Sequence, residues 1–500
     1  MELKALVQQL PAARVEGPLE REIVGVAYDS RRVTPGMLFV AVPGLGVDGH
    51  EFIASAVERG AAAIVCERNG LVSQRATTIR VADARDALAR VAAAFYEHPS
   101  ARIKVIGITG TSGKTMVAFL LKQVLEAAGW PTGLISSVRY EVGERVIPAQ
   151  RTTPEALEIQ QMLAGMVRAG CRACVLEVSS HALDQRRVAA VEFDAAVFTN
   201  LTPDHLDYHP GMEAYFAAKQ RLFTALQAGT KRGGAIINID DAYGQRLAAG
   251  LAPEVLLTYG LGEGARVRAT GMRVGREATE MTVEGPGVRF DCQVPLIGRH
   301  NVYNALAAVG ASLVLGVPAW AIQTALGAVQ PVPGRLEPIV LGQPFGVLVD
   351  YAHTEDSLRH VLATLREITP GRLLLTFGCG GTRDTGKRRR MGAVAAALAD
   401  TTIITTDNPR KEPPEAIATE IAAGYHAVRG EACAIELDRR RAIDALIRLA
   451  RPGDTVLLAG KGHETYQEFQ DTVVPFDDRV YARETLRTLG FSQGEAPERC

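Results

Sequence analysis

Residues 109–115, which read Thr-Gly-Thr-Ser-Gly-Lys-Thr, could hold the phosphates of a nucleotide. Glycines let backbone N–H groups close around phosphate oxygens, and the start of a helix adds a partial positive charge. Lys114 could reach the terminal phosphates, and the Thr115 hydroxyl could hold Mg²⁺. The usual G-x-x-x-x-G-K-T pattern is not met, because Ile108 stands five positions before Gly113. We therefore expect a G-T-x-G-K-T variant that binds phosphate, rather than a glycine turn with a solvated lysine.

A phosphate loop needs a strand before it and a helix after it. Residues 103–108 are mostly apolar, and residues 116–128 read as a helix that ends at Gly129. Three further apolar strands alternate with helical stretches downstream, at residues 174–178, 195–199 and 235–239. This pattern predicts a largely parallel sheet covered by helices, in which ligands bind at the carboxyl ends of the strands.

Polar side chains follow two of these strands. Glu177 suits Mg²⁺, which takes oxygen ligands, and His205 is a possible nitrogen ligand. His181, His205 and His209 together could instead suggest zinc. Beside a Lys-Thr phosphate loop we expect Mg²⁺ with ATP.

Lys219 lies in a helix predicted over residues 212–223. By helical spacing it lies on the same side as four apolar or aromatic residues, Tyr215, Phe216, Leu222 and Phe223. A lysine on such a face often extends its ammonium group to solvent, and this is the simplest interpretation of the position.

Composition narrows the class of protein. The 500 residues suggest roughly three domains, and 47% hydrophobic with 22% charged residues describes a globular chain. The net charge of −1 gives no electrostatic reason to expect nucleic acid. No apolar run approaches the ~18 residues of a membrane span, and the N-terminus lacks a signal-peptide pattern, so we expect a cytoplasmic protein. Among the seven cysteines, Cys171 and Cys174 are expected to be buried thiols rather than zinc ligands.

We expect three α/β domains, at residues 1–98, 99–332 and 333–500. Short strands are predicted in the first domain at residues 24–28, 37–42 and 61–66. Pro99 disfavours helix at the preceding residue, and the two prolines and the glycine of residues 331–335 form a stiff turn between domains.

The third domain repeats the pattern of polar residues after apolar strands. Strands are predicted at residues 346–350, 372–377, 401–406 and 454–458. The polar segments at their ends are residues 350–353, 378–384, 407–410 and 460–464. The glycines at 378–381 lack the G-x-G-x-x-G spacing of a dinucleotide loop. The repeated placement predicts a binding face at one edge of the sheet.

Seven segments, taken together, resemble the Mur ligases of peptidoglycan synthesis. They are Gly-Thr-Ser-Gly-Lys-Thr (110–115), Glu-Val-Ser-Ser-His (177–181), Asn-Leu-Thr-Pro-Asp-His-Leu-Asp (200–207), Gly-Arg-His-Asn-Val-Tyr-Asn (298–304), Gly-Arg (334–335), Asp-Tyr-Ala-His (350–353) and Asp-Asn-Pro-Arg (407–410). The set is most similar to the branch that adds the third peptide residue to UDP-N-acetylmuramoyl-L-alanyl-D-glutamate. Within it, Asp-Asn-Pro-Arg resembles the signature for meso-diaminopimelate rather than lysine. Diaminopimelate has a distal carboxylate that lysine lacks, and the Arg410 fork can hold a carboxylate through two hydrogen bonds.

The resemblance implies a fold and an activity. The fold would be α/β, with a small N-terminal uridine-nucleotide domain, a central P-loop-type parallel-sheet ATPase domain and a C-terminal Rossmann-like domain. The chain would act as a monomer on small molecules, with neither nucleic acid nor membrane as a partner. It would use ATP and Mg²⁺ to join meso-diaminopimelate to the D-glutamyl γ-carboxylate of the UDP-linked dipeptide, through an acyl phosphate.

The resemblance also implies roles for individual residues. ATP would be held by Gly110, Thr111, Ser112, Gly113, Lys114, Thr115, Asn304, Arg335 and Asp350. Mg²⁺ would be held by Thr115, Glu177, His205 and Lys219, the last as a carbamate formed with CO₂. The catalytic set would be Lys114, Glu177, His205 and Lys219. The UDP-linked dipeptide would be held by Ser30, Thr152, Thr153, Ser179, Gln185 and Arg187, with Leu45 to Val47 near the uridine. Diaminopimelate would be held by Arg383, Asp407, Asn408, Pro409, Arg410, Gly460 and Glu464.

The chain departs from the family pattern at four places. Ser112 stands where asparagine is usual, Met116 where threonine is common, and Glu355 where proline is usual. Leu45-Gly46-Val47 replaces a polar triplet, which makes the uridine contacts the least defined. Two alternatives stay open: a lysine-adding or folylpolyglutamate-type ligase on the same scaffold, or a P-loop ATPase or nucleotide-dependent regulatory module.

Overall fold

The structure is a computed structural model that describes residues 1–44, 46–68, 75–275, 278–382, 384–431 and 433–492. It divides into two compact units. The first unit comprises residues 1–268, 284–288 and 303–325, and the second comprises residues 269–283, 289–302 and 326–500. Among the described residues, no helix has the length and apolar character needed to cross a bilayer.

The N-terminal sheet of the first unit has the strand order β1-β5-β4-β3-β2, parallel except for β1. Its strands are β1 (Arg14–Glu16), β2 (Gly25–Ala27), β3 (Met37–Val40), β4 (Ala63–Cys66) and β5 (Thr77–Arg80). Its helices are α1 (Leu3–Val7), α2 (Ile53–Glu58) and α3 (Ala84–Phe95). Helix α3 begins where the Asp83 side chain accepts the backbone N–H groups of Arg85 and Asp86, a standard N-cap. Strands β2, β3 and β4 confirm the three strands predicted for this domain.

A second sheet of the first unit is built around β6 (Lys104–Thr109). The strands of this sheet in the first unit run in the order β13-β12-β11-β6-β10-β7-β8-β9, and Val267 and Arg268 at the start of β14 pair with β13. The rest of β14 and most of β15 and β16 belong to the second unit. Their bounds are β7 (Thr132–Ile135), β8 (Arg139–Val142), β9 (Arg145–Pro148), β10 (Ala173–Glu177), β11 (Ala195–Phe198), β12 (Gly234–Asn238), β13 (Leu256–Gly260), β14 (Val267–Val274), β15 (Thr279–Gly285) and β16 (Val288–Val294). Strands β6, β7, β10, β11, β12 and β13 are parallel, as predicted.

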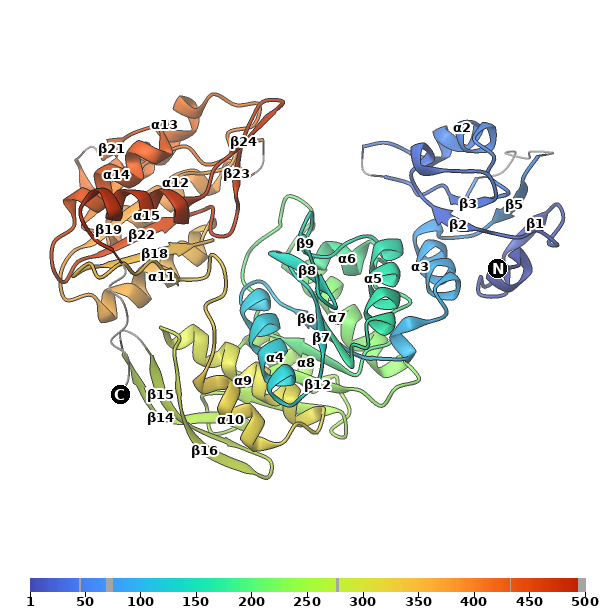
Figure 1. The fold of residues 1–500 in the computed structure, drawn as a ribbon, viewed down its shortest axis with the longest axis horizontal. Helices are drawn as coiled ribbons and strands as arrows, with labels where there is room; N and C mark the ends of the chain where they lie inside the picture. The colour runs from blue at the N-terminus through green and yellow to red at the C-terminus, as the bar shows by residue number, and fades with distance from the viewer. Residues whose placement is uncertain (45, 69–74, 276–277, 383, 432, 493–500) are drawn as a thin grey trace. The chain divides into compact units, whose positions relative to one another are not determined.

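Helices come between or after these strands along the chain. They are α4 (Lys114–Ala127), α5 (Ala156–Arg168), α6 (Ser180–Asp184), α7 (Met212–Ala228), α8 (Ala242–Ala249), α9 (Arg299–Val314) and α10 (Ala319–Gly327). Helix α4 packs on β6, β7 and β10, and α7 packs on β11, β6 and β12 (Figure 1). Gly107 permits the second contact, because a Cβ there would press on Phe193 and on Leu222 of α7. Apart from the exposed Lys104 of β6 and the partly buried Leu256 and Thr258 of β13, the parallel strands are buried, which explains their apolar sequences.

The second unit carries a six-stranded sheet with the order β17-β18-β22-β19-β20-β21. Its strands are β17 (Glu337–Pro338), β18 (Gly346–Asp350), β19 (Leu373–Phe377), β20 (Thr401–Ile404), β21 (Ala434–Ile435) and β22 (Thr455–Ala459). A separate hairpin pairs β23 (Tyr466–Phe469) with β24 (Thr472–Pro475). All of the main-sheet strands are parallel except β17, and the four predicted strands are confirmed.

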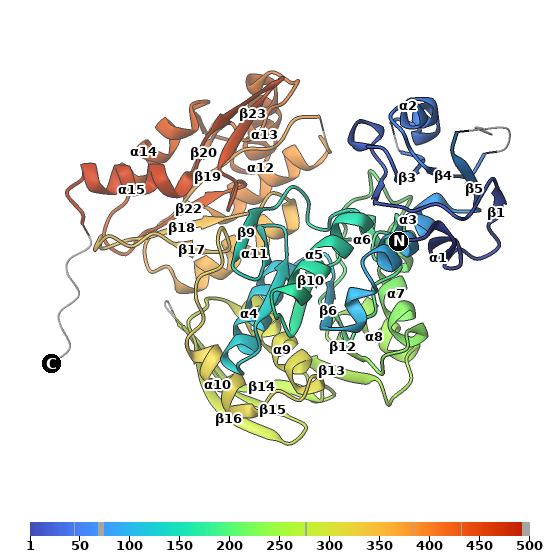
Figure 2. The ribbon, with the colours of Figure 1, turned by 45° about the vertical axis from the view of Figure 1, so that its right-hand side comes forward.

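Both faces of this sheet are covered by helices. Leu373, Leu375 and Phe377 of β19 point into a core shared with α11 (Glu355–Ile368), α12 (Lys387–Leu398) and α13 (Pro414–Arg429). Leu374, between them, points into the opposite core with α14 (Arg439–Leu449) and α15 (Asp478–Thr488), which lie side by side (Figure 2). Alternate strand residues thus face opposite layers, and the polar residues after the strands are left at one edge.

Cys171 and Cys174 are buried free thiols, as predicted, and burial raises the pKa of Cys174.

Candidate active site

The phosphate loop lies between β6 and α4, as its sequence requires. Gly110 has φ +148°, and a Cβ there would overlap the Thr199 hydroxyl at the end of β11. Gly113 has φ +87°, in the left-handed region, and a Cβ there would press on the side-chain oxygen of Asn304. Both positions therefore require glycine. The loop is held close to β11 and to α9, and α9 brings the predicted ATP residue Asn304 beside it.

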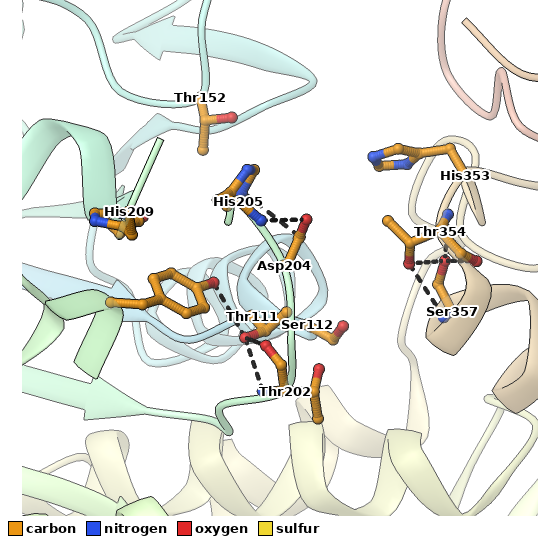
Figure 3. A network of polar contacts seen from close by, with 12 residues as sticks. Thr111, Ser112, Thr152, Thr202, Asp204, His205, His209, His353, Thr354 and Ser357 are labelled. Carbon is orange, nitrogen blue, oxygen red and sulfur yellow. Dashed lines mark hydrogen bonds and ion pairs between the residues drawn. The ribbon is translucent and has the colours of Figure 1, made fainter. Parts of the chain in front are cut away.

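Side chains that follow β11 fix the shape of this loop. Asn200 Oδ1 accepts the backbone N–H of Ser112 at 2.9 Å, and the Thr199 hydroxyl donates to the Ser112 carbonyl at 2.7 Å. The Thr111 hydroxyl lies 3.1 Å from the Tyr215 hydroxyl and accepts the Thr202 N–H at 3.1 Å (Figure 3). Asn200 and Tyr215 are not among the predicted site residues, although Asn200 lies in the same segment as His205 and Tyr215 in the same helix as Lys219.

Two lysines donate to the same loop carbonyl. Lys114 Nζ donates to the carbonyl oxygens of Gly110 and Thr111 at 2.9 and 2.8 Å. Lys219 Nζ donates to Gly110 O at 2.8 Å and lies 4.5 Å from the centre of the Tyr215 ring. The interpretation that Lys219 extends to solvent is wrong, because the residue is 1% exposed. Burial, reinforced by the charge of Lys114, lowers the pKa of Lys219 well below its usual value. A neutral amine is the form that can react with CO₂.

Thr115 and Glu177, two of the predicted Mg²⁺ ligands, are in contact. The Thr115 hydroxyl donates to Glu177 Oε2 at 3.0 Å, and the Ser137 N–H and hydroxyl donate to the same carboxylate at 2.9 and 3.1 Å. Glu177 is completely buried and ends β10. Among the described residues, only neutral donors hold this carboxylate, so it offers negative charge to a cation.

His205 lies in the segment after β11, with φ +55°. Its backbone N–H donates to Asp204 Oδ1 at 2.8 Å (Figure 3). Its ring lies edge-on to the His181 ring, with centroids 4.9 Å apart. Partial burial lowers the pKa of His205, and burial together with His205 lowers the pKa of His181 to about 4. Neutral imidazole is the form that binds metal ions. His209 instead bonds the Ser180 hydroxyl at 2.9 Å.

Five of the predicted dipeptide-binding residues form one polar cluster. The Thr153 hydroxyl donates to the Glu177 carbonyl at 2.8 Å and accepts the Ser179 N–H at 3.0 Å. Arg187 donates to Thr153 O at 2.9 Å and to Gln185 Oε1 at 2.7 Å. The Thr152 hydroxyl lies 3.1 Å from the Ser137 hydroxyl and so lies next to the Glu177 site.

The sixth, Ser30, is buried in a 3₁₀ turn, residues Ser30–Arg32, that follows β2. The Asp29 carboxylate accepts the Arg31 N–H, so this polar segment also fits an ordinary capped turn. Tyr28, just before it, donates to Glu158 of α5 at 2.9 Å. Leu45, predicted near the uridine, lies outside the described residues.

Arg335 and Asp350, predicted to bind ATP, lie together in the second unit. Asp350 ends β18 and accepts the backbone N–H groups of Leu336 and Ala352, each at 2.8 Å. Burial raises the pKa of Asp350, an effect that the charge of Arg335 opposes. The Arg335 guanidinium stacks on the Tyr351 ring, 4.9 Å from its centre.

The predicted amino-acid residues also gather in the second unit. Asn408 Nδ2 donates to Glu464 Oε2 at 2.9 Å, which links the segment after β20 to the segment after β22. Gly460 adjoins Asp407, because a Cβ there would lie 2.7 Å from Asp407 Oδ2. Pro409 and Arg410 line a cavity of about 410 Å³ with residues 411–415 and the β23–β24 turn. Arg383 lies outside the described residues.

Arg410 is held at one edge of its guanidinium group. Nε donates to Glu468 Oε2 at 2.8 Å, and Nη1 donates to Gly381 O at 3.0 Å. Among the described residues, Nη2 has no acceptor. The backbone of Arg410 has φ +53°, and its N–H donates to the Glu468 carbonyl oxygen at 3.0 Å. Glu468 was not anticipated, because nothing in its sequence surroundings marks a contact with a residue 58 positions away.

One departure from the family pattern has a local explanation. Glu355, in place of proline, is the first residue of α11, whose N-cap is Thr354 (Figure 3). Proline is favoured there by its fixed φ, and glutamate by the positive end of the helix. Ser112 and Met116 are likewise accommodated, Ser112 through its backbone bonds and Met116 by burial.

Three profiles of one family match the chain. The profile described as "Mur ligase family, catalytic domain" matches residues 22–96, "Mur ligase middle domain" matches residues 108–312, and "Mur ligase, glutamate ligase domain" matches residues 334–462.

Similar proteins extend over almost the whole chain. The UDP-N-acetylmuramoyl-L-alanyl-D-glutamate–2,6-diaminopimelate ligase of Syntrophomonas wolfei is 44% identical over 488 residues, which cover 97% of this chain and 99% of that protein. The protein of the same name from Gloeobacter violaceus is 46% identical over 467 residues, covering 93% and 94%. A solved structure under that name matches with a TM-score of 0.69 at 30% identity, covering 98% and 100%. A folylpolyglutamate synthase of Mycobacterium tuberculosis, at 18% identity and a TM-score of 0.63, shares the fold alone.

Proposed function

Because the chain belongs to the Mur ligase family, we propose that it joins meso-2,6-diaminopimelate to UDP-N-acetylmuramoyl-L-alanyl-D-glutamate at the expense of ATP. The observation that carries this assignment is the full-length identity of 44–46% to proteins named for that reaction. Arg410 supports the choice of amino acid, since its Nη2 has no acceptor among the described residues and could bind the distal carboxylate.

ATP would bind at the phosphate loop of the first unit. Gly110 to Thr115 supply backbone N–H groups and the start of α4, and Lys114 can exchange its loop carbonyls for phosphate oxygens. Asn304, beside Gly113, and Arg335 with Asp350 of the second unit complete the proposed set.

The residues fit Mg²⁺. Thr115 and Glu177 are oxygen ligands in contact, His205 has a lowered pKa, and Lys219 is a buried amine that carbamylation would turn into an oxygen ligand. When bound, Mg²⁺ neutralises charge on the transferred phosphoryl group.

The reaction has two transfers. The D-glutamyl γ-carboxylate attacks the γ-phosphorus of ATP, and the bond to ADP breaks, which leaves an acyl phosphate. The neutral amine of diaminopimelate then attacks the acyl carbon; an amide forms, phosphate leaves and the amine loses a proton. Orientation and charge stabilisation account for such catalysis, and here Lys114 supplies charge while Thr152, Thr153, Ser179, Gln185 and Arg187 hold the dipeptide.

The proposal extends to the setting of the reaction. We place it in the cytoplasm, in the synthesis of peptidoglycan precursors, because both ATP and UDP-linked precursors are made there. All of the proposed ligands belong to one chain, so a monomer suffices. The domain bounds at 98 and 332 belong to the proposal, and the N-terminal sheet with Ser30 would hold the uridine.

The test is phosphate release from ATP with the UDP-linked dipeptide and either meso-diaminopimelate or L-lysine. We expect release that requires both the dipeptide and an amino acid and that strongly favours diaminopimelate. Preference for lysine would keep the family and contradict the amino-acid assignment. Release that is indifferent to both substrates would favour the ATPase alternative.

A further inference from the structure

Lys461 is a completely buried lysine at the amino-acid site, and the residues assigned to substrate above do not include it. It follows Gly460 just beyond the carboxyl end of β22. Its Nζ donates to Glu464 Oε2 at 2.9 Å and to Asn408 Oδ1 at 3.1 Å, and lies 4.0 Å from Asp407 Oδ1. Burying a charge costs free energy unless partners compensate it, so a completely buried lysine at this site suggests a functional role.

The network around Lys461 fixes two side chains and leaves one oxygen available. Asn408 Oδ1 also accepts the Glu468 N–H at 3.0 Å. Because both Lys461 and this N–H can only donate, the amide must point its oxygen toward them. Its Nδ2 donates to the same Glu464 Oε2 that Lys461 contacts. Glu464 Oε1 has no hydrogen-bond partner in the described part of the chain. The network thus holds the carboxylate by one oxygen and presents the other.

The charges of Asp407, Glu464 and Lys461 suit the binding of one ammonium group. Asp407 and Glu464 carry two negative charges, and Lys461 neutralises one of them. One negative charge remains, which matches the single ammonium group at the distal end of diaminopimelate. Without Lys461 the two carboxylates would repel each other, and Glu464 would lose one of the two donors that orient it.

We infer that Lys461 is a positioning residue, which acts through Glu464 to orient the amino-acid substrate. The inference rests on the proposed function, because it takes diaminopimelate as the ligand of this site. The competing explanation is a structural ion pair that only stabilises the sheet. The chain offers a control for that explanation at the opposite end of β22. There Asp454 is buried and pairs with Arg372 at 2.7 Å, away from the carboxyl edge of the strands.

The experiment is a double-mutant cycle with Lys461→Met, Glu464→Gln and both together, read as KM for each of the three substrates. Asp454→Asn is the control for lost stability. We expect Lys461→Met to raise KM for meso-diaminopimelate at least tenfold, with KM for ATP and for the UDP-linked dipeptide within twofold. In the Glu464→Gln background, Lys461→Met should raise KM for meso-diaminopimelate less than threefold, because the two residues act as one unit. Asp454→Asn should lower the unfolding midpoint and leave all three KM values within twofold.

Independent, multiplicative effects of Lys461→Met and Glu464→Gln on KM would overturn the inference, as would equal changes in all three KM values. Lys461→Gln, which keeps hydrogen-bond donors without charge, replaces Lys461→Met if the latter does not fold, and carries the same expectations. Measurements on the wild-type enzyme distinguish failure of the proposed function from failure of the role of Lys461. Absence of diaminopimelate-dependent turnover in the wild type contradicts the proposed function itself. Normal wild-type turnover with an unchanged KM in both Lys461 variants contradicts only the role of Lys461.

Discussion

Replacement of Arg410 by methionine should remove the recognition of the distal carboxylate of diaminopimelate. The Nε and one Nη1 hydrogen of Arg410 are engaged by Glu468 and Gly381, so the carboxylate is expected at the Nη1–Nη2 edge. Charge-assisted hydrogen bonds contribute about 1.5–3 kcal/mol each. The Arg410 side chain is 18% exposed, and solvent weakens its hydrogen bonds to the carboxylate. We therefore take about 3 kcal/mol for the two hydrogen bonds from Nη1 and Nη2 together. That corresponds to roughly 100-fold in kcat/KM, at about 1.4 kcal/mol per tenfold.

The assay is ADP formation with saturating ATP and UDP-linked dipeptide, with either diaminopimelate or L-lysine varied. Lysine has no distal carboxylate, so Arg410→Met should reduce kcat/KM for lysine less than threefold. Arg389→Met, at an exposed position of α12 in the same unit, controls for general loss of positive charge and should leave both values within twofold. Glu468 keeps about a third of its side chain exposed, so water can replace its lost partner. Equal losses for the two amino acids, or a loss below fivefold for diaminopimelate, would refute the reasoning.

Three further results are expected. Lys219→Ala should reduce kcat by at least about 100-fold with KM for the dipeptide little changed, and ¹³C-labelled CO₂ should give a carbamate NMR signal in wild type that this variant lacks; an active variant would contradict the role. Asp478→Asn should lower the free energy of unfolding by about 3–5 kcal/mol in urea, because it strands the buried Arg439, and a loss below 1 kcal/mol would contradict the burial of this pair. Burial lowers the pKa of His300 to about 4, against about 6.5 in the unfolded chain, so its stabilising effect is complete above pH ~6.5 and is lost as pH falls toward 4. His300→Gln should therefore show a smaller drop in unfolding midpoint between pH 7 and 5 than wild type, and an unchanged drop would contradict this assignment.

Much of the fold could be predicted because its signals are local. The phosphate loop, its strand and its helix are contiguous, and buried parallel strands read as apolar runs such as 195–199. The three-domain α/β description is confirmed by the three matched segments of the family. The predicted boundaries at residues 98 and 332 stay predictions.

The predicted site residues group as the topology of parallel sheets suggests. Thr115 meets Glu177 because β6 and β10 are neighbours, and Asn408 meets Glu464 across the carboxyl edge of the second-unit sheet. The functions of these residues remain proposals. What the sequence lacked was any sign of the side chains that hold them, such as Ser137 and Glu468, because those contacts depend on which segments the fold brings together.

By itself, the sequence determined the element types, the phosphate loop and the family, since each is written in the identity and spacing of neighbouring residues. Only the tertiary structure decided the environment of individual charges. Lys219 reads as a snorkelling lysine in its helix, yet packing of α7 on β6 and β11 closes it off from water and lowers its pKa. Lys461 reads as one polar residue in a loop, yet it is buried among Asp407, Asn408 and Glu464. The physical reason is that desolvation and charge pairing depend on residues far apart in the chain.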